Sequence, residues 1–251
     1  MWILAHGIVV RLLDWLAIPH GMTRQLSATV PSLAALVVLF TLLIRRAQHL
    51  TLPAAFATLG LGRARHGLRQ VVVALVATIP IALVLAAPAG WIGGRWMFRP
   101  DALELLPHLV LGVAVMEELT FRGFLFSRLR VIVNFRVATV WSAVLFGATH
   151  GIPLFAGLES GAIRGPHAPL IVFLGLLVPM LFSVPVSRMF ERAGGSLWGP
   201  VIAHLGFDLA NLFAWKPGTM TSSTFMLLAQ AASLVILMLG TRPAARGRRA
   251  R

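Results

Sequence analysis

Apolar segments of helix length alternate with short polar connections along almost the whole chain. Such segments lie at residues 2–18, 27–44, 68–92, 103–126, 137–150, 169–187, 197–213 and 222–240. A helix needs about 20 mostly apolar residues to cross a bilayer, so the shorter segments are expected to extend beyond these bounds. The pattern predicts an all-α, polytopic transmembrane helix bundle with about eight spans.

The first of these segments is the weakest. It contains His6, Arg11 and Asp14, it has no basic region ahead of its apolar stretch, and no convincing small-residue cleavage site follows it. A secretory signal peptide would have both features. We therefore expect a transmembrane or interfacial helix here, and seven spans if this segment does not cross the membrane.

The composition supports a membrane protein. Hydrophobic residues make up 58% of the 251 residues and charged residues only 12%, far from the balance of a soluble domain. The chain has no cysteine, which excludes disulfides, thiolate metal sites and a cysteine nucleophile. The net charge of +14 comes almost entirely from arginine. Without a nucleic-acid recognition motif, this charge is better explained by membrane topology and anionic membrane lipid than by nucleic acid.

Basic residues are distributed unequally between alternate connections. One set of connections contains Arg24, Arg95, Arg99, Arg164 and Lys216, whereas the other contains most of the remaining arginines. Cytoplasmic loops of membrane proteins are enriched in Lys and Arg. The second set is therefore predicted to be cytoplasmic, together with both termini. The basic tail at residues 241–251 is expected to bind anionic headgroups.

Three charges interrupt the apolar segment 103–126. Glu117, Glu118 and Arg122 lie in the stretch VMEELTFRGF, although the chain has only 8 acidic residues. Glu118 and Arg122 are four residues apart on one helix face, where an ion pair lowers the cost of burying both. Glu117 points about 100° away and lacks such a local partner. Ionisable groups inside a membrane usually mark functional sites, and a purely structural charge cluster is the alternative.

Two later segments carry further polar residues. Phe146 and His150 are one turn apart in FGATH. His204, Asp208 and Asn211 are spaced i, i+4 and i+7, so they share one stripe of a helix. A polar stripe inside a membrane must face protein or a water-filled cavity. The simpler interpretations are a solvated helix end for His150 and a helix–helix contact for the stripe.

Together these segments provide a candidate catalytic site of Glu117, His150, His204 and Asp208. A carboxylate and an imidazole can activate water for attack on an amide. The same four side chains are candidate ligands of a divalent metal such as Zn, which would then activate the water. Both alternatives describe peptide hydrolysis. A non-enzymatic membrane protein, either a transporter or a binding protein, could use the same polar residues.

Three motifs in this order resemble those of the CPBP family, the CAAX proteases and bacteriocin-processing enzymes, also called Abi. They are EExxxR at 117–122, FxxxH at 146–150 and HxxxD at 204–208, and the preceding ERAGGSLWGPVIAH is also similar. The resemblance covers about residues 105–213. It implies an intramembrane endopeptidase, labelled a metalloprotease in many members, with a core of eight helices and a peptide or protein substrate.

The resemblance also implies roles for the site residues. Glu117 would be the general base, and His150 would help to activate the water. His204 and Asp208 would stabilise the oxyanion, while Glu118 and Arg122 would brace the site as a structural ion pair.

Asp208 departs from the Asn that can end the third motif. An ionised Asp208 cannot donate a hydrogen bond to an oxyanion, so it would be protonated, orient His204 or ligate a metal. Asn211 then offers a possible oxyanion donor on the same stripe. A family member in bacteria could act in bacteriocin maturation or self-immunity, and no residue pattern indicates a prenylated substrate.

The chain divides into three parts on this basis. Residues 1–102 hold N-terminal transmembrane helices and a basic cytoplasmic loop with a short helix near residues 52–60. Residues 103–213 form the CPBP-like catalytic core, and residues 214–251 form the last span and the basic tail. The preference for Arg over Lys and the richness in Ala, Gly and Pro fit a high-GC bacterium. The expected location is therefore the bacterial cytoplasmic membrane.

Overall fold

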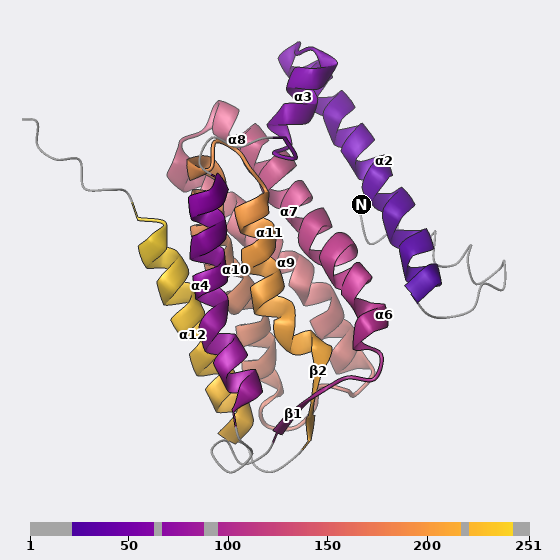
Figure 1. Cartoon of the computed structure of the whole chain (residues 1–251), viewed down its shortest axis with the longest axis vertical. Coiled ribbons are helices and arrows are strands. Elements are labelled where there is room, and N and C mark those ends of the chain that lie inside the picture. The colour runs from indigo at the N-terminus through magenta and orange to yellow at the C-terminus, as the bar shows by residue number, and fades with distance from the viewer. Residues whose placement is uncertain (1–21, 63–66, 88–94, 217–220, 243–251) are drawn as a thin grey trace, which may run out of the picture.

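The computed structural model describes residues 22–62, 67–87, 95–216 and 221–242. The segment predicted at residues 2–18 and most of the basic tail lie outside these ranges. The described residues form a bundle of helices with one two-stranded ribbon at one end (Figure 1). The predicted all-α membrane bundle is confirmed, and the ribbon is an addition that the sequence pattern did not predict.

The helices follow the apolar segments. They are α2 (Met22–Gln48), α3 (Leu52–Thr58), α4 (Gly67–Ala86), α6 (Ala102–Pro107), α8 (Ser127–Ile132), α9 (Phe135–Glu159), α10 (Ala168–Arg192), α11 (Trp198–Asp208) and α12 (Thr221–Gly240). A short 3₁₀-helix, η3 (Leu209–Leu212), follows α11. The expected short helix in the basic loop is α3.

The charged segment between α6 and α8 has an unusual backbone. It runs through a π-helix, η1 (His108–Val115), one α-helical turn, α7 (Met116–Glu118), and a second π-helix, η2 (Leu119–Phe126). π-Helical turns are rare and occur frequently at functional sites. The two adjacent glutamates therefore lie between two stretches of irregular helix.

Among the described residues, four helices are long and apolar enough to cross a membrane. They cover residues 26–48, 67–86, 135–159 and 168–192. Length and composition thus support a multi-pass membrane protein, and the number of eight spans stays a prediction. Helix α9 runs nine residues beyond the predicted end at His150, because Pro153 is accommodated within it. Proline is tolerated in membrane helices where neighbours satisfy the freed backbone groups.

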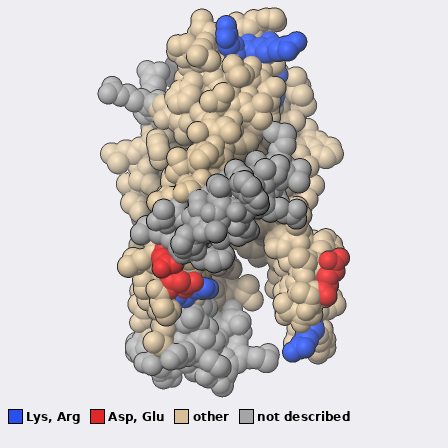
Figure 2. All heavy atoms as spheres, turned by 90° about the vertical axis from the view of Figure 1, so that its right-hand side faces the viewer, with Lys and Arg blue, Asp and Glu red and all other residues tan. Residues whose placement is uncertain are grey.

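The two predicted sets of basic connections lie at opposite ends of the bundle. Helices α3 and α8 share one end with the C-terminal ends of α10 and α12, and the ribbon lies at the other (Figure 1). On the face in Figure 2, the visible charged side chains lie toward the two ends, and the described surface between them is uncharged. This distribution suits an apolar membrane interior between two polar interfaces.

A β-ribbon links the two parts of the chain that carry the charged motifs. Strand β1 (Arg95–Phe98) precedes α6, strand β2 (Phe213–Lys216) follows η3, and the two pair antiparallel. The rings of Phe98 and Phe213 meet edge to face with their centroids 5.5 Å apart. The backbone N–H of Arg99 donates to the carbonyl oxygen of Leu212 at 2.9 Å. The ribbon therefore ties the beginning of the glutamate segment to the end of the histidine helix.

Glycines allow the helices around the site to pack closely. Helix α4 packs against α11 and α12, and α9 packs against α10. A Cβ added at Gly206 of α11 would overlap the side chain of Thr78 in α4, and one at Gly147 of α9 would overlap Met180 in α10. Larger residues here would push apart helices whose spacing positions the polar side chains.

Replacement of Gly206 by alanine is expected to destabilise the bundle. Overpacking of a tight contact typically costs about 1–3 kcal/mol. We expect Gly206→Ala to lower the thermal unfolding midpoint in detergent, and Thr78→Ser to restore part of it by removing the overlapping methyl group. The control is Gly62→Ala, because a Cβ there has no neighbour within 4 Å. An equal effect of the two alanine variants would contradict the packing argument.

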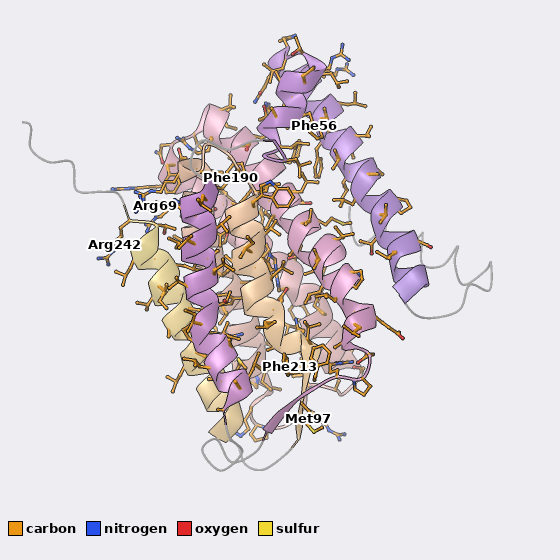
Figure 3. The ribbon with its side chains drawn as sticks, in the orientation of Figure 1. Phe56, Arg69, Met97, Phe190, Phe213 and Arg242 are labelled. Carbon is orange, nitrogen blue, oxygen red and sulfur yellow. The ribbon has the colours of Figure 1, made fainter. Side chains whose placement is uncertain are left out.

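Four arginines gather where α4 begins and where α10 and α12 end. Arg192 interacts electrostatically with Arg69 and Arg188, and Arg69 and Arg242 lie at the same end of the bundle (Figure 3). Among the described residues, none of the four forms an ion pair with a carboxylate. Like charges held close together attract an anion, which at a membrane surface is a lipid phosphate.

Anionic lipid is therefore expected to stabilise the protein through this end. Phosphatidylglycerol added to the detergent-solubilised protein should raise its unfolding midpoint more than phosphatidylcholine does. Arg192→Gln should reduce that difference, whereas Arg164→Gln, at the exposed opposite end, should leave it unchanged. An undiminished lipid response of Arg192→Gln would show that the arginine cluster does not bind the headgroup.

Candidate active site

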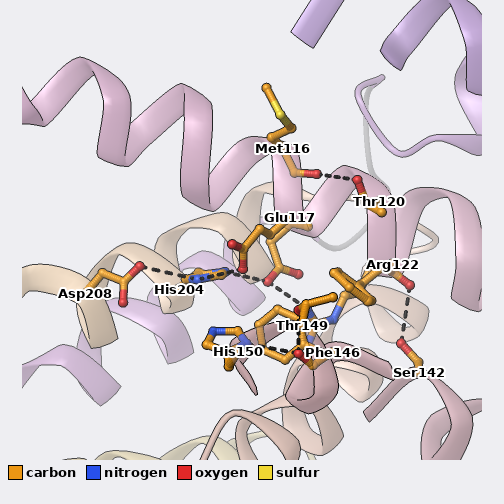
Figure 4. Close-up of polar contacts among 12 residues, drawn as sticks. Met116, Glu117, Thr120, Arg122, Ser142, Phe146, Thr149, His150, His204 and Asp208 are labelled. Atoms are coloured by element: carbon orange, nitrogen blue, oxygen red, sulfur yellow. Dashed lines mark hydrogen bonds and ion pairs between the residues drawn. The ribbon is translucent and has the colours of Figure 1, made fainter. Parts of the chain in front are cut away.

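His204 lies between carboxylates from two helical segments. Its Nδ1 is 2.8 Å from Oε1 of Glu118, on α7. Its Nε2 is 3.4 Å from Oδ2 of Asp208 and 3.7 Å from Oε2 of Glu117 (Figure 4). The imidazole is buried, with 5% of its side chain exposed. It can donate to carboxylates at both nitrogens only when both carry a proton.

Glu118 and Arg122 form a fully buried ion pair. Nη1 of Arg122 is 2.9 Å from Oε1 of Glu118, and neither side chain is exposed. The same oxygen, Oε1, faces both Arg122 and His204. The spacing in the sequence predicted the ion pair but not the second contact. Glu118 is therefore positioned by Arg122 and in turn positions His204.

Aromatic rings enclose the charged groups. The guanidinium of Arg122 lies 4.6 Å from the centroid of the Phe146 ring. The same ring meets His150 and His204 edge to face, with centroids 4.8 and 5.9 Å apart. Phe182 of α10 packs against His204 from another side. Phe146 thus contacts a cation and two imidazoles. The sequence pattern did not identify Phe182 as a site residue, because it lies in a uniformly apolar segment.

Glu117 has a carboxylate oxygen that is available for chemistry. About a fifth of its side chain, 18%, is exposed. Its Oε2 is buried and has no hydrogen-bond partner among the described residues, although Nε2 of His204 lies 3.7 Å away. A buried acceptor without a partner is costly, so such an atom is suited to bind a water molecule or a substrate group.

His150 lies at the wall between two cavities. Its Nδ1 is 2.9 Å from the carbonyl oxygen of Phe146, one turn earlier in α9. The larger cavity, about 450 Å³, is lined by His150 with Glu117 and Thr149, and by apolar residues of α2 and η2. The smaller, about 290 Å³, is lined by His150 with His204 and Asp208, and by residues of α10 and α12. The candidate residues therefore separate two spaces inside the bundle.

Asn211 does not join the other polar residues. The α-helix ends at Asp208, and the chain continues as the 3₁₀-helix η3 toward β2. The stripe therefore continues as an α-helix only as far as Asp208, and the role of Asn211 stays a prediction. Asn211 is exposed and lines neither of the two cavities. Its position gives no support to a role as oxyanion donor.

The candidate metal ligands do not form a ligand set in the described part of the chain. No group of three or more His, Asp or Glu residues there is arranged to hold a metal ion. The nitrogens of His204 face Glu118 on one side and Glu117 with Asp208 on the other. These are hydrogen-bond or ion-pair contacts between the side chains themselves.

The fold and the site define a helical membrane protein with a carboxylate–histidine cluster between two cavities. Residues 99–210 match the family described as type II CAAX prenyl endopeptidase Rce1-like. Over these residues the chain is similar to the CAAX protease family, and the resemblance of its three motifs is confirmed. No curated protein and no solved structure is significantly similar to the chain. The family supports a CAAX-type intramembrane protease activity in general.

Disruption of the buried ion pair is expected to destabilise the protein strongly. Removal of one partner of a buried pair typically costs about 3–5 kcal/mol, since the other charge stays buried. We expect Glu118→Gln to lower the unfolding midpoint far more than Glu191→Gln, which breaks the exposed pair with Arg130. The double variant Glu118→Gln with Arg122→Gln should recover part of the loss. Equal effects of the two single variants would contradict this assignment.

Proposed function

We propose that the protein is an intramembrane endopeptidase in which Glu117 activates a water molecule for attack on a peptide bond. The observation that carries this proposal is the position of Glu117, which lines the larger cavity and has its Oε2 3.7 Å from Nε2 of His204. A general base needs a carboxylate within reach of the reacting atoms. The match of residues 99–210 to the CAAX prenyl endopeptidase family supports the same reaction class.

In this mechanism Glu117 takes a proton from the water as the water oxygen attacks the carbonyl carbon. His150, in the wall of the same cavity, helps to hold the water. The tetrahedral intermediate carries a negative oxygen, which accepts a hydrogen bond from Nε2 of His204. Protonated Glu117 then gives its proton to the leaving amine, and the peptide bond breaks.

The carboxylates around His204 support this role. Because Nδ1 donates to Glu118, Nε2 can donate to the oxyanion only in the doubly protonated ring. Asp208, 3.4 Å from Nε2, favours that positive ring and orients it. An ionised Asp208 thus assists His204 and need not itself donate to the oxyanion. Arg122 balances the charge of Glu118, which lowers the cost of placing three carboxylates around one imidazole.

The proposal also covers the substrate, the location and the cofactor of the protein. The substrate is a peptide or protein segment with an apolar part, since the cavity beside Glu117 is walled by Leu36, Phe40 and Phe124. The location is the bacterial cytoplasmic membrane, with the arginine-rich end and both termini on the cytoplasmic side. Metal analysis of the active protein tests whether a divalent metal such as Zn takes part in the reaction.

The test is cleavage of a peptide library by purified protein in detergent. We expect Glu117→Gln to lower the cleavage rate by about 10²–10⁴-fold, because the variant cannot accept the proton. The matched control is Glu159→Gln, at the exposed end of α9. The metal content of the same wild-type sample, measured by mass spectrometry, shows whether activity follows a bound ion.

Two outcomes would overturn the mechanism or the function. Full activity of Glu117→Gln would exclude Glu117 as the base. A wild-type protein that binds peptides but cleaves none would favour the non-enzymatic alternative, a membrane binding protein that uses the same polar cluster.

A further inference from the structure

The smaller cavity connects the polar cluster to the last helix. One wall holds His150, His204 and Asp208. The opposite wall includes Val178 of α10 with Leu227 and Gln230 of α12. The cavity therefore begins at the proposed oxyanion-binding group and ends at a mainly apolar surface with one amide.

The size of this cavity exceeds what a single reacting water needs. Its volume is about 290 Å³, whereas one water occupies about 30 Å³ in the liquid. The volume is close to the lower limit of small-ligand sites, about 300 Å³. Leu174, Val178 and Phe207 give its wall an apolar character. A space of this size and lining fits one apolar side chain better than a file of water molecules.

The arrangement of the two cavities fits an extended peptide. Side chains of successive residues in an extended chain point to opposite sides. His150 contributes to both cavities, Glu117 only to the larger one, and His204 with Asp208 only to the smaller. A peptide bond held at this boundary would place its two flanking side chains in different cavities.

Charge limits which side chain the smaller cavity accepts. His204 is faced by the carboxylates of Glu117, Glu118 and Asp208, and Asp208 lines the cavity. An acidic side chain would be repelled there, while an apolar one would bury its surface against α10 and α12. The amide of Gln230 can donate to and accept from a peptide backbone, which has both kinds of group.

Part of the wall of the smaller cavity lies outside the segment that matches the family. The family match ends at residue 210, whereas Leu227 and Gln230 belong to α12. The polar cluster lies within the matched segment. The last helix can therefore alter the cavity without any change to the reacting groups.

We infer that the cavity between Asp208 and α12 is a substrate subsite for an apolar, non-acidic side chain next to the cleaved bond, with Gln230 as a hydrogen-bonding residue for the substrate backbone. This inference rests on the proposed endopeptidase function. It assigns the side chain on the other side of the bond to the larger cavity at α2 and η2.

Two neighbouring leucines of α12 provide a matched test. Leu227 lines the cavity, whereas Leu228 does not and is 60% exposed. We expect Leu227→Trp to shift the substrate preference at one position beside the cleaved bond toward smaller side chains. For substrates with a large side chain at that position, kcat/KM should fall by about tenfold. Leu228→Trp should retain the wild-type preferences. Leu36→Trp, in the larger cavity, should change the preference on the other side of the bond.

Gln230 is tested through the kinetic constants. Gln230→Leu should raise KM by about tenfold with kcat nearly unchanged, because a contact made equally in ground and transition states is lost. Gln230→Asn, which keeps the amide, should recover part of the effect. An unchanged KM in Gln230→Leu would remove this residue from the subsite.

A binding measurement separates the inference from the function. Peptides with a diazirine-bearing leucine at successive positions are cross-linked to the Glu117→Gln variant, and the labelled segments are mapped by mass spectrometry. One position should label α10 or α12, and the next should label α2 or η2. If the peptides label these segments but the wild-type protein cleaves none of them, the result would support the subsite and contradict the proposed endopeptidase activity. Cleavage without labelling of α10 and α12, with wild-type preferences in Leu227→Trp, would overturn the subsite.

Discussion

The buried contact of Glu118 with Arg122 and His204 is the interaction on which the site depends. One carboxylate oxygen faces a guanidinium at 2.9 Å and an imidazole nitrogen at 2.8 Å, and none of these groups is more than slightly exposed. A carboxylate in an apolar environment is tolerated only with close partners. The two contacts join the glutamate segment to α11, so the charge cluster also fixes where Glu117 lies relative to Nε2 of His204.

The surrounding helices make this cluster possible. Phe146 lies against Arg122 and both histidines, and Phe182 closes another side of His204. Close packing at Gly147 and Gly206 brings α10 and α4 against the helices that carry these residues. The β-ribbon holds the far ends of the two site segments together. Contacts with α4, α9, α10 and the β-ribbon thus help to determine where the site residues lie, and most of these contacts are apolar.

The sequence could predict the fold class and the ion pair because both follow local rules. Runs of apolar residues indicate membrane helices, and the spacing of Glu118 and Arg122 places them on one helix face. The contact between Glu118 and His204 spans 86 positions and has no local signal. The end of α11 at Asp208, three residues before Asn211, also has no local signal, since it depends on the turn into β2. The ribbon was missed because its strands have four residues each and meet only in three dimensions.

Some helices lie inside the segment that matches the CAAX protease family and others lie outside it. This division suggests how the same reaction can be directed at different substrates. The polar cluster lies within residues 99–210, whereas α2 contributes part of the wall of the larger cavity and α12 part of the wall of the smaller one, both from outside that segment. The cluster tolerates little change, because Glu118, Arg122 and His204 are buried and depend on one another. Apolar cavity walls tolerate changes of size at a much lower cost in stability. Substrate preference can therefore vary through the outer helices while the carboxylate–histidine geometry stays constant.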